Sequence, residues 1–261
     1  MRQELSQNMN DVTAHTNINE TTGRPEDRKG GKKPKKAEKV YSPKEEKLNI
    51  ATHIFGAAVC GVFGVLMIIK SCIGVAGGEY GASAIVGTAI FTFSLLVTYI
   101  MSAIYHSCKP GTTARAVMRR FDHCSIALLI AGSYLVYSIV GLINRGTDQP
   151  ADTVWGIVIA SVEGVLAIVI IALNGVSVEK FKIFTLIAYI VMGWMIIFRV
   201  YHLVLALPTS AFVLLLLGGI AYTAGVPFYK IDKIPYNHAI WHLFVLAGSV
   251  LMICSVLFCL L

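Results

Sequence analysis

The sequence predicts an all-α fold, a polytopic membrane protein built as a seven-transmembrane helix bundle. Of its 261 residues, 56% are hydrophobic and only 14% are charged, and the mean hydropathy is +0.68. An average soluble domain has about 25% charged residues. The apolar residues form continuous runs of about 20, the length a helix needs to cross about 30 Å of hydrocarbon. Because the runs are continuous, they lack the alternation of a membrane β-barrel.

Each predicted transmembrane helix corresponds to one such run. In chain order the runs cover residues 48–69, 84–105, 124–143, 154–173, 183–204, 211–228 and 239–261.

Basic residues in the connecting loops predict the orientation. Alternate loops are rich in lysine and arginine: Lys109, Arg115, Arg119, Arg120, Lys180, Lys182, Lys230 and Lys233. The other loops hold little beyond Lys70, Arg145 and Arg199. Cytoplasmic loops of membrane proteins carry the excess of lysine and arginine. We therefore expect a cytoplasmic N-terminus and, with seven crossings, a C-terminus outside.

The N-terminal segment differs from the rest of the chain. Half of the 22 basic residues lie before Leu48, so the net charge of +7 is largely a property of this tail and does not indicate a nucleic-acid partner. The stretch "RKGGKKPKKAEK" has almost no apolar residue with which to form a core. We predict a disordered basic cytoplasmic tail at 1–44 and a membrane domain at 45–261. The tail either contacts anionic lipid headgroups or is a solvated tail without a specific partner.

Polar residues from three predicted helices gather at the cytoplasmic face. Ser102 and His106 stand at i and i+4 at the end of the second helix, and Asp122 begins the third. In "YNHAIWH", His238 and His242 stand at i and i+4 at the start of the seventh. Residues four apart lie on one face of a helix. Ionisable groups in membrane helices are costly and usually mark a functional site.

Three neutral imidazoles suit a zinc ion. Ligation by His106, His238 and His242 leaves a fourth position open to water, as in catalytic zinc sites. Asp122 then either receives a proton from the water or completes a closed site as a ligand, and Ser102 donates a hydrogen bond nearby. His123 follows Asp122 and points about 100° away on the helix, so it is not expected to be a ligand.

Two further polar residues are weaker signals. Glu163 lies midway along the fourth run, where a lone carboxyl is either protonated or paired within the bundle. His53 lies one turn into the first helix with Asn49 and is interpreted as structural, since three imidazoles already complete the site.

Several motifs together resemble the hemolysin III family, the bacterial branch of the progestin and adipoQ receptor superfamily. They are "EEKLNIATHIFGA", "SAIYHS", "RRFDHCSIALLIAGSY", "YIVMGW" and "GGIAYTAGVPFYKIDKIPYNHAIWHLFVLAG". The pattern is also similar to that of alkaline ceramidases. The resemblance runs from Glu45 to the C-terminus. It implies a multi-pass protein of the bacterial plasma membrane, with zinc on His106, His238 and His242, Asp122 contacting the metal directly or through water, and Ser102 beside it.

The leading functional hypothesis is a metal-dependent hydrolase that cleaves an amide or ester of a membrane lipid presented from the inner leaflet. Asp122 would act as general base, and Ser102 would orient water or stabilise a developing oxyanion. One alternative is a sensor or receptor-like protein in which zinc only joins helices. A lytic pore ranks last, because the helices lack a continuous polar stripe.

Overall fold

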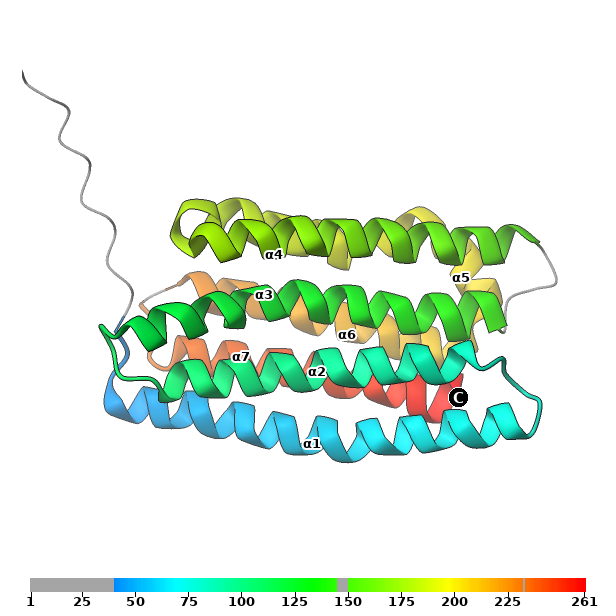
Figure 1. The fold of residues 1–261 in the computed structure, drawn as a ribbon, viewed down its shortest axis with the longest axis horizontal. Coiled ribbons are helices and arrows are strands. Elements are labelled where there is room, and N and C mark those ends of the chain that lie inside the picture. Colours follow the sequence, from blue (N-terminus) through cyan, green and yellow to red (C-terminus); the bar gives the residue numbers. More distant parts are fainter. Residues whose placement is uncertain (1–39, 145–149, 232) are drawn as a thin grey trace, which may run out of the picture. The chain divides into compact units, whose positions relative to one another are not determined.

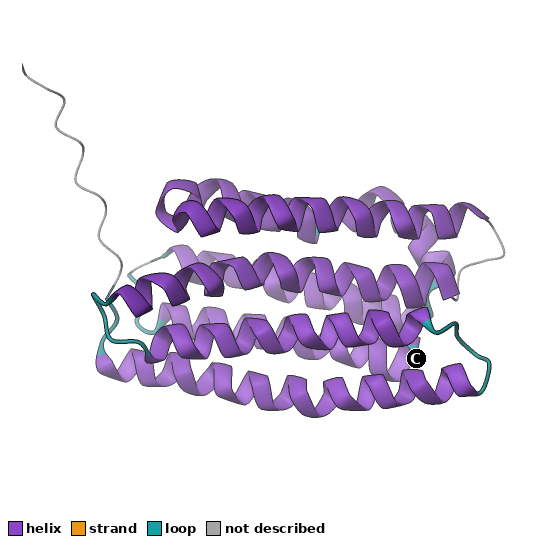
Figure 2. Cartoon of the chain, in the orientation of Figure 1, coloured by secondary structure: helices purple, strands orange, loops and turns teal. Residues whose placement is uncertain are grey.

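Residues 39–261 form one compact unit in the computed structural model, which describes residues 40–144, 150–231 and 233–261. Every regular element in these ranges is a helix (Figure 2). The all-α fold class is thereby confirmed for the described residues. The predicted tail, 1–44, falls almost wholly on residues 1–39, which lie outside the described part of the chain.

The first helix, α1 (Pro43–Ala76), begins at a capping box. The Ser42 hydroxyl accepts a hydrogen bond from the backbone N of Glu45 at 3.3 Å, and Glu45 Oε2 accepts one from the backbone N of Ser42 at 2.9 Å. Pro43 occupies the first turn, where its missing N–H leaves no intrahelical bond unmade. These signals place Glu46 in the first turn of α1.

Small residues let α1 approach α2 (Ser83–Ser107) closely. A Cβ at Gly56 would lie 2.3 Å from Tyr99 Cε1, and one at Gly64 would lie 2.2 Å from Thr92 Cγ2. Helices in membranes associate through such small-residue contacts. Since α1 also packs against α7 (Asn237–Cys254), it lies between the helices that carry the histidines.

The third and fourth helices continue the bundle beyond α2. The helix α3 (Thr113–Val136) begins at Thr112, whose hydroxyl accepts from the backbone N of Arg115, and passes into a π-helix, η1 (Tyr137–Asn144). It packs against α2 on one side and against α4 (Pro150–Gly193) on the other.

The α4 segment is two helices joined at Ser177, where φ is −165° and ψ is 109°. Asn174 Nδ2 donates to Tyr189 Oη at 2.8 Å, and both groups reach the carbonyl of His123. In one straight helix, residues 174 and 189 would be about 22 Å apart. The chain therefore folds back at Ser177 (Figure 1).

A second interruption follows α4. The Tyr134 hydroxyl donates to the carbonyl of Gly193 at 3.1 Å and accepts from the backbone N of Ile196 at 3.0 Å, so it replaces helical bonds missing there. The chain continues through a short 3-10 helix, η2 (Met195–Arg199), and then α5 (Val200–Ala206) and α6 (Thr209–Lys230). The α7 helix packs against α6 and ends in a π-helix, η3 (Ser255–Leu260).

Six described segments are long and apolar enough to cross a membrane. They are Pro43–Ala76, Ser83–Ser107, Thr113–Ile143, Thr153–Ala206, Thr209–Lys230 and Asn237–Leu260. Six segments replace the seven predicted ones because Thr153–Ala206 contains both the 154–173 run and the 183–204 run. A polytopic membrane architecture is confirmed, and the number of crossings depends on how this segment of 54 residues is divided.

Candidate metal centre

Three imidazoles meet where α2 ends and α7 begins. The ligand nitrogens of His106, His238 and His242 all lie within 4.8 Å of one another. His106 Nε2 and His238 Nε2 are 3.1 Å apart, and the rings of His238 and His242 have centroids 4.4 Å apart. His106 and His242 are buried, and His238 is half-buried. Thus the residues predicted from two i, i+4 spacings form one cluster.

The turn from α6 into α7 fixes the position of His238. Asn237 Nδ2 donates to the carbonyls of Phe228 at 3.0 Å and Ile231 at 3.2 Å, which ties the start of α7 to the end of α6. Tyr236, just before it, has φ of 55°, an uncommon conformation for a residue with a side chain. The asparagine and the left-handed turn together direct "NHAIWH" toward α1 and α2.

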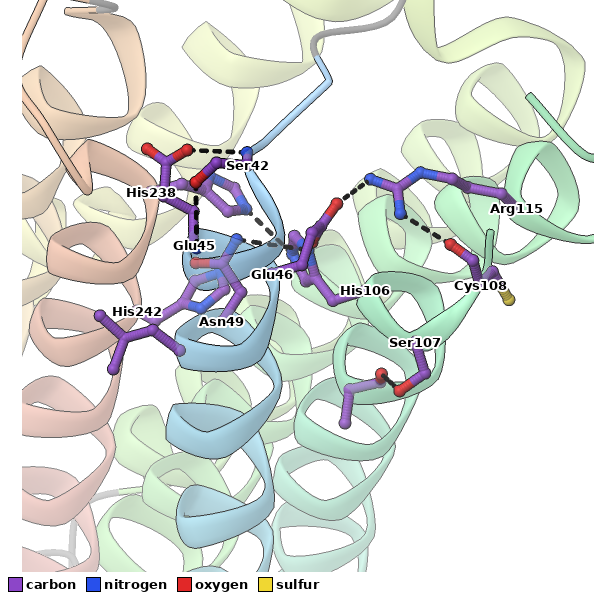
Figure 3. Close-up of polar contacts among 12 residues, drawn as sticks. Ser42, Glu45, Glu46, Asn49, His106, Ser107, Cys108, Arg115, His238 and His242 are labelled. Carbon is purple, nitrogen blue, oxygen red and sulfur yellow. Dashed lines mark hydrogen bonds and ion pairs between the residues drawn. The ribbon is translucent and has the colours of Figure 1, made fainter. Parts of the chain in front are cut away.

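The Nδ1 atoms of two of these rings contact α1. His106 Nδ1 lies 2.7 Å from Glu46 Oε2 (Figure 3) and 3.5 Å from Asn49 Nδ2. His242 Nδ1 lies 3.2 Å from Thr52 Oγ1. The α1 helix therefore lines one side of the cluster.

A buried arginine completes this arrangement. Arg115 of α3 is only 1% exposed, and its Nη2 lies 2.5 Å from Glu46 Oε1 while its Nη1 donates to the carbonyl of Cys108 at 2.9 Å. Its guanidinium also lies over the Tyr105 ring, 4.7 Å from the centroid. Glu46 therefore contacts both Arg115 and His106, and all three side chains are labelled in Figure 3.

Asp122 and Ser102 lie beside the three histidines. Ser102 is buried and hydrogen-bonds to the Asp122 carboxylate, which interacts electrostatically with His106 and His238. In the described part of the chain, the group of possible metal ligands contains the three histidines without Asp122. Both predicted roles of Asp122, as a direct ligand or as a group that accepts a proton from water, stay predictions.

The other histidines at this end have different surroundings. His53 is buried, its ring centroid is 3.9 Å from that of His242, and neither ring nitrogen has a hydrogen-bond partner among the described residues. His123 Nδ1 hydrogen-bonds to the carbonyl of Arg119 at 2.9 Å and lies 3.4 Å from Asp122 Oδ2. Neither belongs to the three-histidine group.

The sequence reasoning missed the part played by Glu46, Thr52 and Arg115. Glu46, Asn49 and His53 recur at intervals of three and four, which places polar groups on one face of an otherwise apolar helix. That periodicity was a usable signal. Arg115 appeared in the sequence only as a topology-determining charge, and its burial depends on contacts between helices.

The residue type and spacing of the cluster suit a divalent transition metal. Zinc–nitrogen distances of about 2.0–2.1 Å require ligand atoms a few ångströms apart that present lone pairs to one point. The Nε2 atoms of His106 and His238, 3.1 Å apart, meet the distance requirement, and His106 has its other partner, Glu46, at Nδ1. Histidine ligands in metal sites usually have the second ring nitrogen bonded to a carboxylate or carbonyl, as His106 has here.

Comparison with known proteins decides the family. A family model described as "Haemolysin-III related" matches residues 41–253, a range that includes every residue of the cluster. The chain belongs to the haemolysin-III related family. "Hemolysin-3" of Bacillus cereus is 35% identical over 216 residues, covering 82% of this chain and 91% of that protein. "Hemolysin-3 homolog" of Bacillus subtilis (strain 168) is 35% identical over 220 residues, covering 84% and 96%.

This membership confirms the resemblance inferred from the motifs. Together with its apolar helices, it makes the chain a multi-pass bacterial membrane protein of the haemolysin-III related family. The buried three-histidine group is a site that could hold a metal ion.

Proposed function

We propose that this haemolysin-III related protein is a zinc-dependent hydrolase that cleaves an amide or ester bond of a membrane lipid. The observation that carries the proposal is the group of three imidazoles at one end of the apolar helices, with Asp122 and Ser102 beside it. This composition leaves a coordination position for water or substrate, as catalytic zinc sites do.

The proposal includes seven crossings with the N-terminus in the cytoplasm and the C-terminus outside. A straight helix over Thr153–Ala206 would be about 80 Å long, far more than the hydrocarbon core of about 30 Å. The break at Ser177 divides this segment, and Lys180 and Lys182 follow the break. Basic residues there agree with a cytoplasmic turn, on the same face as the metal centre.

A bound metal would contribute to the chemistry in two ways. A bound zinc ion acts as a Lewis acid that polarises a carbonyl group and lowers the pKa of a water molecule in the site. His106, His238 and His242 would hold it. Imidazole also suits other transition metals, so zinc is the proposal and other ions are outcomes of its test.

Asp122 and Ser102 supply the proton handling. The Asp122 carboxylate accepts a proton from the attacking water and returns it to the leaving amine or alcohol. The hydroxyl of Ser102, hydrogen-bonded to Asp122, keeps the carboxylate oriented toward the centre. A lipid entering from the inner leaflet would place its polar linkage at this depth while its acyl chains stay among apolar helices.

A second function has one observation in its favour. The three histidines come from α2 and α7, which both pack on α1, so a metal ion would join these two helices directly. A sensor or receptor-like protein would need the metal only for this connection between helices. A lytic activity, to which the name of the Bacillus cereus relative refers, has no comparable observation in the described helices.

The deciding experiment compares wild-type protein with Asp122→Asn in lipid vesicles. The substrates are an N-acyl sphingoid base and a diacyl phospholipid, with Glu79→Gln, in the loop that follows α1, as a charge-matched control. We expect lipid consumption by wild type that a chelator stops. Asp122→Asn should keep its metal within about 10- to 100-fold in affinity and lose turnover. Hydrolysis by Asp122→Asn at the wild-type rate would show that the aspartate takes no part in the reaction. If zinc-loaded wild-type protein hydrolyses neither lipid, the hydrolase proposal fails and the second function, a metal ion that only joins α2 and α7, is supported.

We also propose that the basic tail contacts anionic lipid headgroups, at about 1 kcal/mol for each nearby cation. Its support is the lysine-rich sequence between Arg28 and Lys39. Protease cleavage of the tail should be slower in anionic vesicles than in neutral ones. Equal cleavage rates in the two kinds of vesicle would indicate a solvated tail without a specific partner.

A further inference from the structure

We propose that α1 positions the metal ligands, with Glu46 and Thr52 holding His106 and His242 in the tautomer whose Nε2 lone pair faces the metal. Arg115 holds Glu46 in place for this task. The inference rests on the proposed metal centre and deepens it, since it assigns a function to three residues outside the ligand set.

The first step concerns His106. Its Nδ1 lies 2.7 Å from Glu46 Oε2, and an ionised carboxylate only accepts hydrogen bonds. Nδ1 must therefore carry the proton. The amide nitrogen of Asn49 is 3.5 Å from the same atom, at the outer limit of a hydrogen bond, so the shorter contact determines the tautomer. In the neutral ring, Nε2 is then left with a lone pair.

The second step concerns His242 and follows the same logic. Thr52 has one hydroxyl hydrogen, and the carbonyls of Leu48 at 3.0 Å and Asn49 at 2.9 Å lie nearer to its oxygen than His242 Nδ1 does at 3.2 Å. We assign the hydrogen to a carbonyl, so that the hydroxyl accepts from His242; a backbone hydrogen bond from the His242 ring to Asn49 also favours a protonated ring nitrogen. His242 is thus also protonated at Nδ1 and presents Nε2.

The third step concerns the charge of Glu46. One carboxylate oxygen faces Arg115 Nη2 at 2.5 Å and the other faces His106. Glu46 is half-buried and Arg115 is buried, so each charge needs a partner, and the guanidinium supplies the compensating charge for the carboxylate. Because Arg115 also bonds to the carbonyl of Cys108, just after α2, it links Glu46 to the end of the helix that carries His106.

A carboxylate on the far nitrogen of a histidine ligand fixes the ring and raises its basicity, and loss of such a group typically costs about 10- to 100-fold in metal affinity. Glu46→Gln keeps the shape of the side chain and removes one of its two acceptor oxygens. Arg115 and His106 both donate, and an amide has a single acceptor oxygen, so one donor loses its partner.

The experiment measures the zinc affinity of detergent-purified full-length protein by competition with a chromophoric chelator. Cobalt-substituted protein is compared by its visible absorption spectrum. We expect Glu46→Gln to weaken zinc binding about 10- to 100-fold and to change the cobalt spectrum. Glu79 is an exposed carboxylate in the loop that follows α1, and Glu79→Gln should leave both unchanged.

A second pair of variants tests the same principle at His242. Thr52→Val removes the acceptor and should weaken binding, while Thr52→Ser keeps it and should restore the wild-type affinity. If Glu46→Gln does not fold, this pair decides in its place. The inference is overturned if Glu46→Gln, or Thr52→Val in its stead, binds zinc within twofold of wild type with an unchanged cobalt spectrum. If wild type itself binds no metal, the proposed function fails first, so the two failures are distinguishable.

Discussion

Two groups of ionisable residues lie inside the apolar segments, and they differ in their partners. At the histidine cluster, both oxygens of Glu46 and both ring nitrogens of His106 have polar partners. Glu163 of α4 is 0% exposed, and neither carboxylate oxygen has a hydrogen-bond partner in the described part of the chain. One and two turns further along the same face, Ala167 and Ile170 pack in an apolar cluster.

The difference separates two ways to accommodate a carboxyl group in a membrane. An ionised carboxylate without a partner is too costly to bury, so it is either paired or protonated. Glu46 is paired with Arg115 and can serve as a permanent negative charge near a metal. Of the two states predicted for Glu163, the described surroundings favour the protonated one. A polar residue in a span is therefore a strong functional signal only when its partners are also present.

Removing the partner of the paired carboxylate should have the largest effect. Arg115→Met leaves the half-buried Glu46 carboxylate without its guanidinium partner, which should lower the free energy of unfolding by about 1.5–3 kcal/mol. Denaturation in detergent measures this, with the exposed Arg120→Met as the matched control and an expected change of about 0.5 kcal/mol. Equal destabilisation by the two variants would mean that the ion pair between Arg115 and Glu46 contributes no more than a surface contact.

The unpaired carboxyl should tolerate replacement much better. Glu163→Gln has nearly the same shape as the neutral acid, so we expect a change of about 1 kcal/mol or less in either direction. The same denaturation series detects it. A loss as large as that of Arg115→Met would contradict the protonated state and point to an ionised Glu163 with a partner outside the described residues.

His53 should tolerate replacement as well as Glu163 does, because it lies at the cluster and its ring nitrogens have no hydrogen-bond partner among the described residues. His53→Phe keeps a ring against His242 and Tyr99 and removes only unpartnered atoms, so we expect a full complement of metal and a stability change of about 1 kcal/mol or less. Elemental analysis checks the metal, with His242→Phe as the variant expected to lose it. Metal loss in His53→Phe would make His53 a ligand.

The sequence predicted features that one helix expresses by itself. Apolar runs indicated the helices, and the i, i+4 spacings brought His106, His238 and His242 to the correct helix ends. The break at Ser177 was anticipated only as a gap between two runs, since residues 154–206 stay apolar enough to form one segment.

The spacing of polar residues along the first helix could be seen in the sequence, but the contacts that Glu46, Thr52 and Arg115 make with other helices could not. Glu46 and His106 are far apart in sequence, and their contact depends on how closely α1 approaches α2 at Gly56 and Gly64. That approach is set by side-chain packing between helices, which the sequence of one chain does not reveal.

The most direct test of the account is the metal content of detergent-purified protein. Elemental analysis should find about one zinc ion per chain in wild type, as expected for a single three-histidine site. A folded His238→Ala/His242→Ala double variant should contain none. A folded wild-type protein without bound metal, or a double variant that keeps its zinc, would contradict the proposal that these imidazoles form a metal centre.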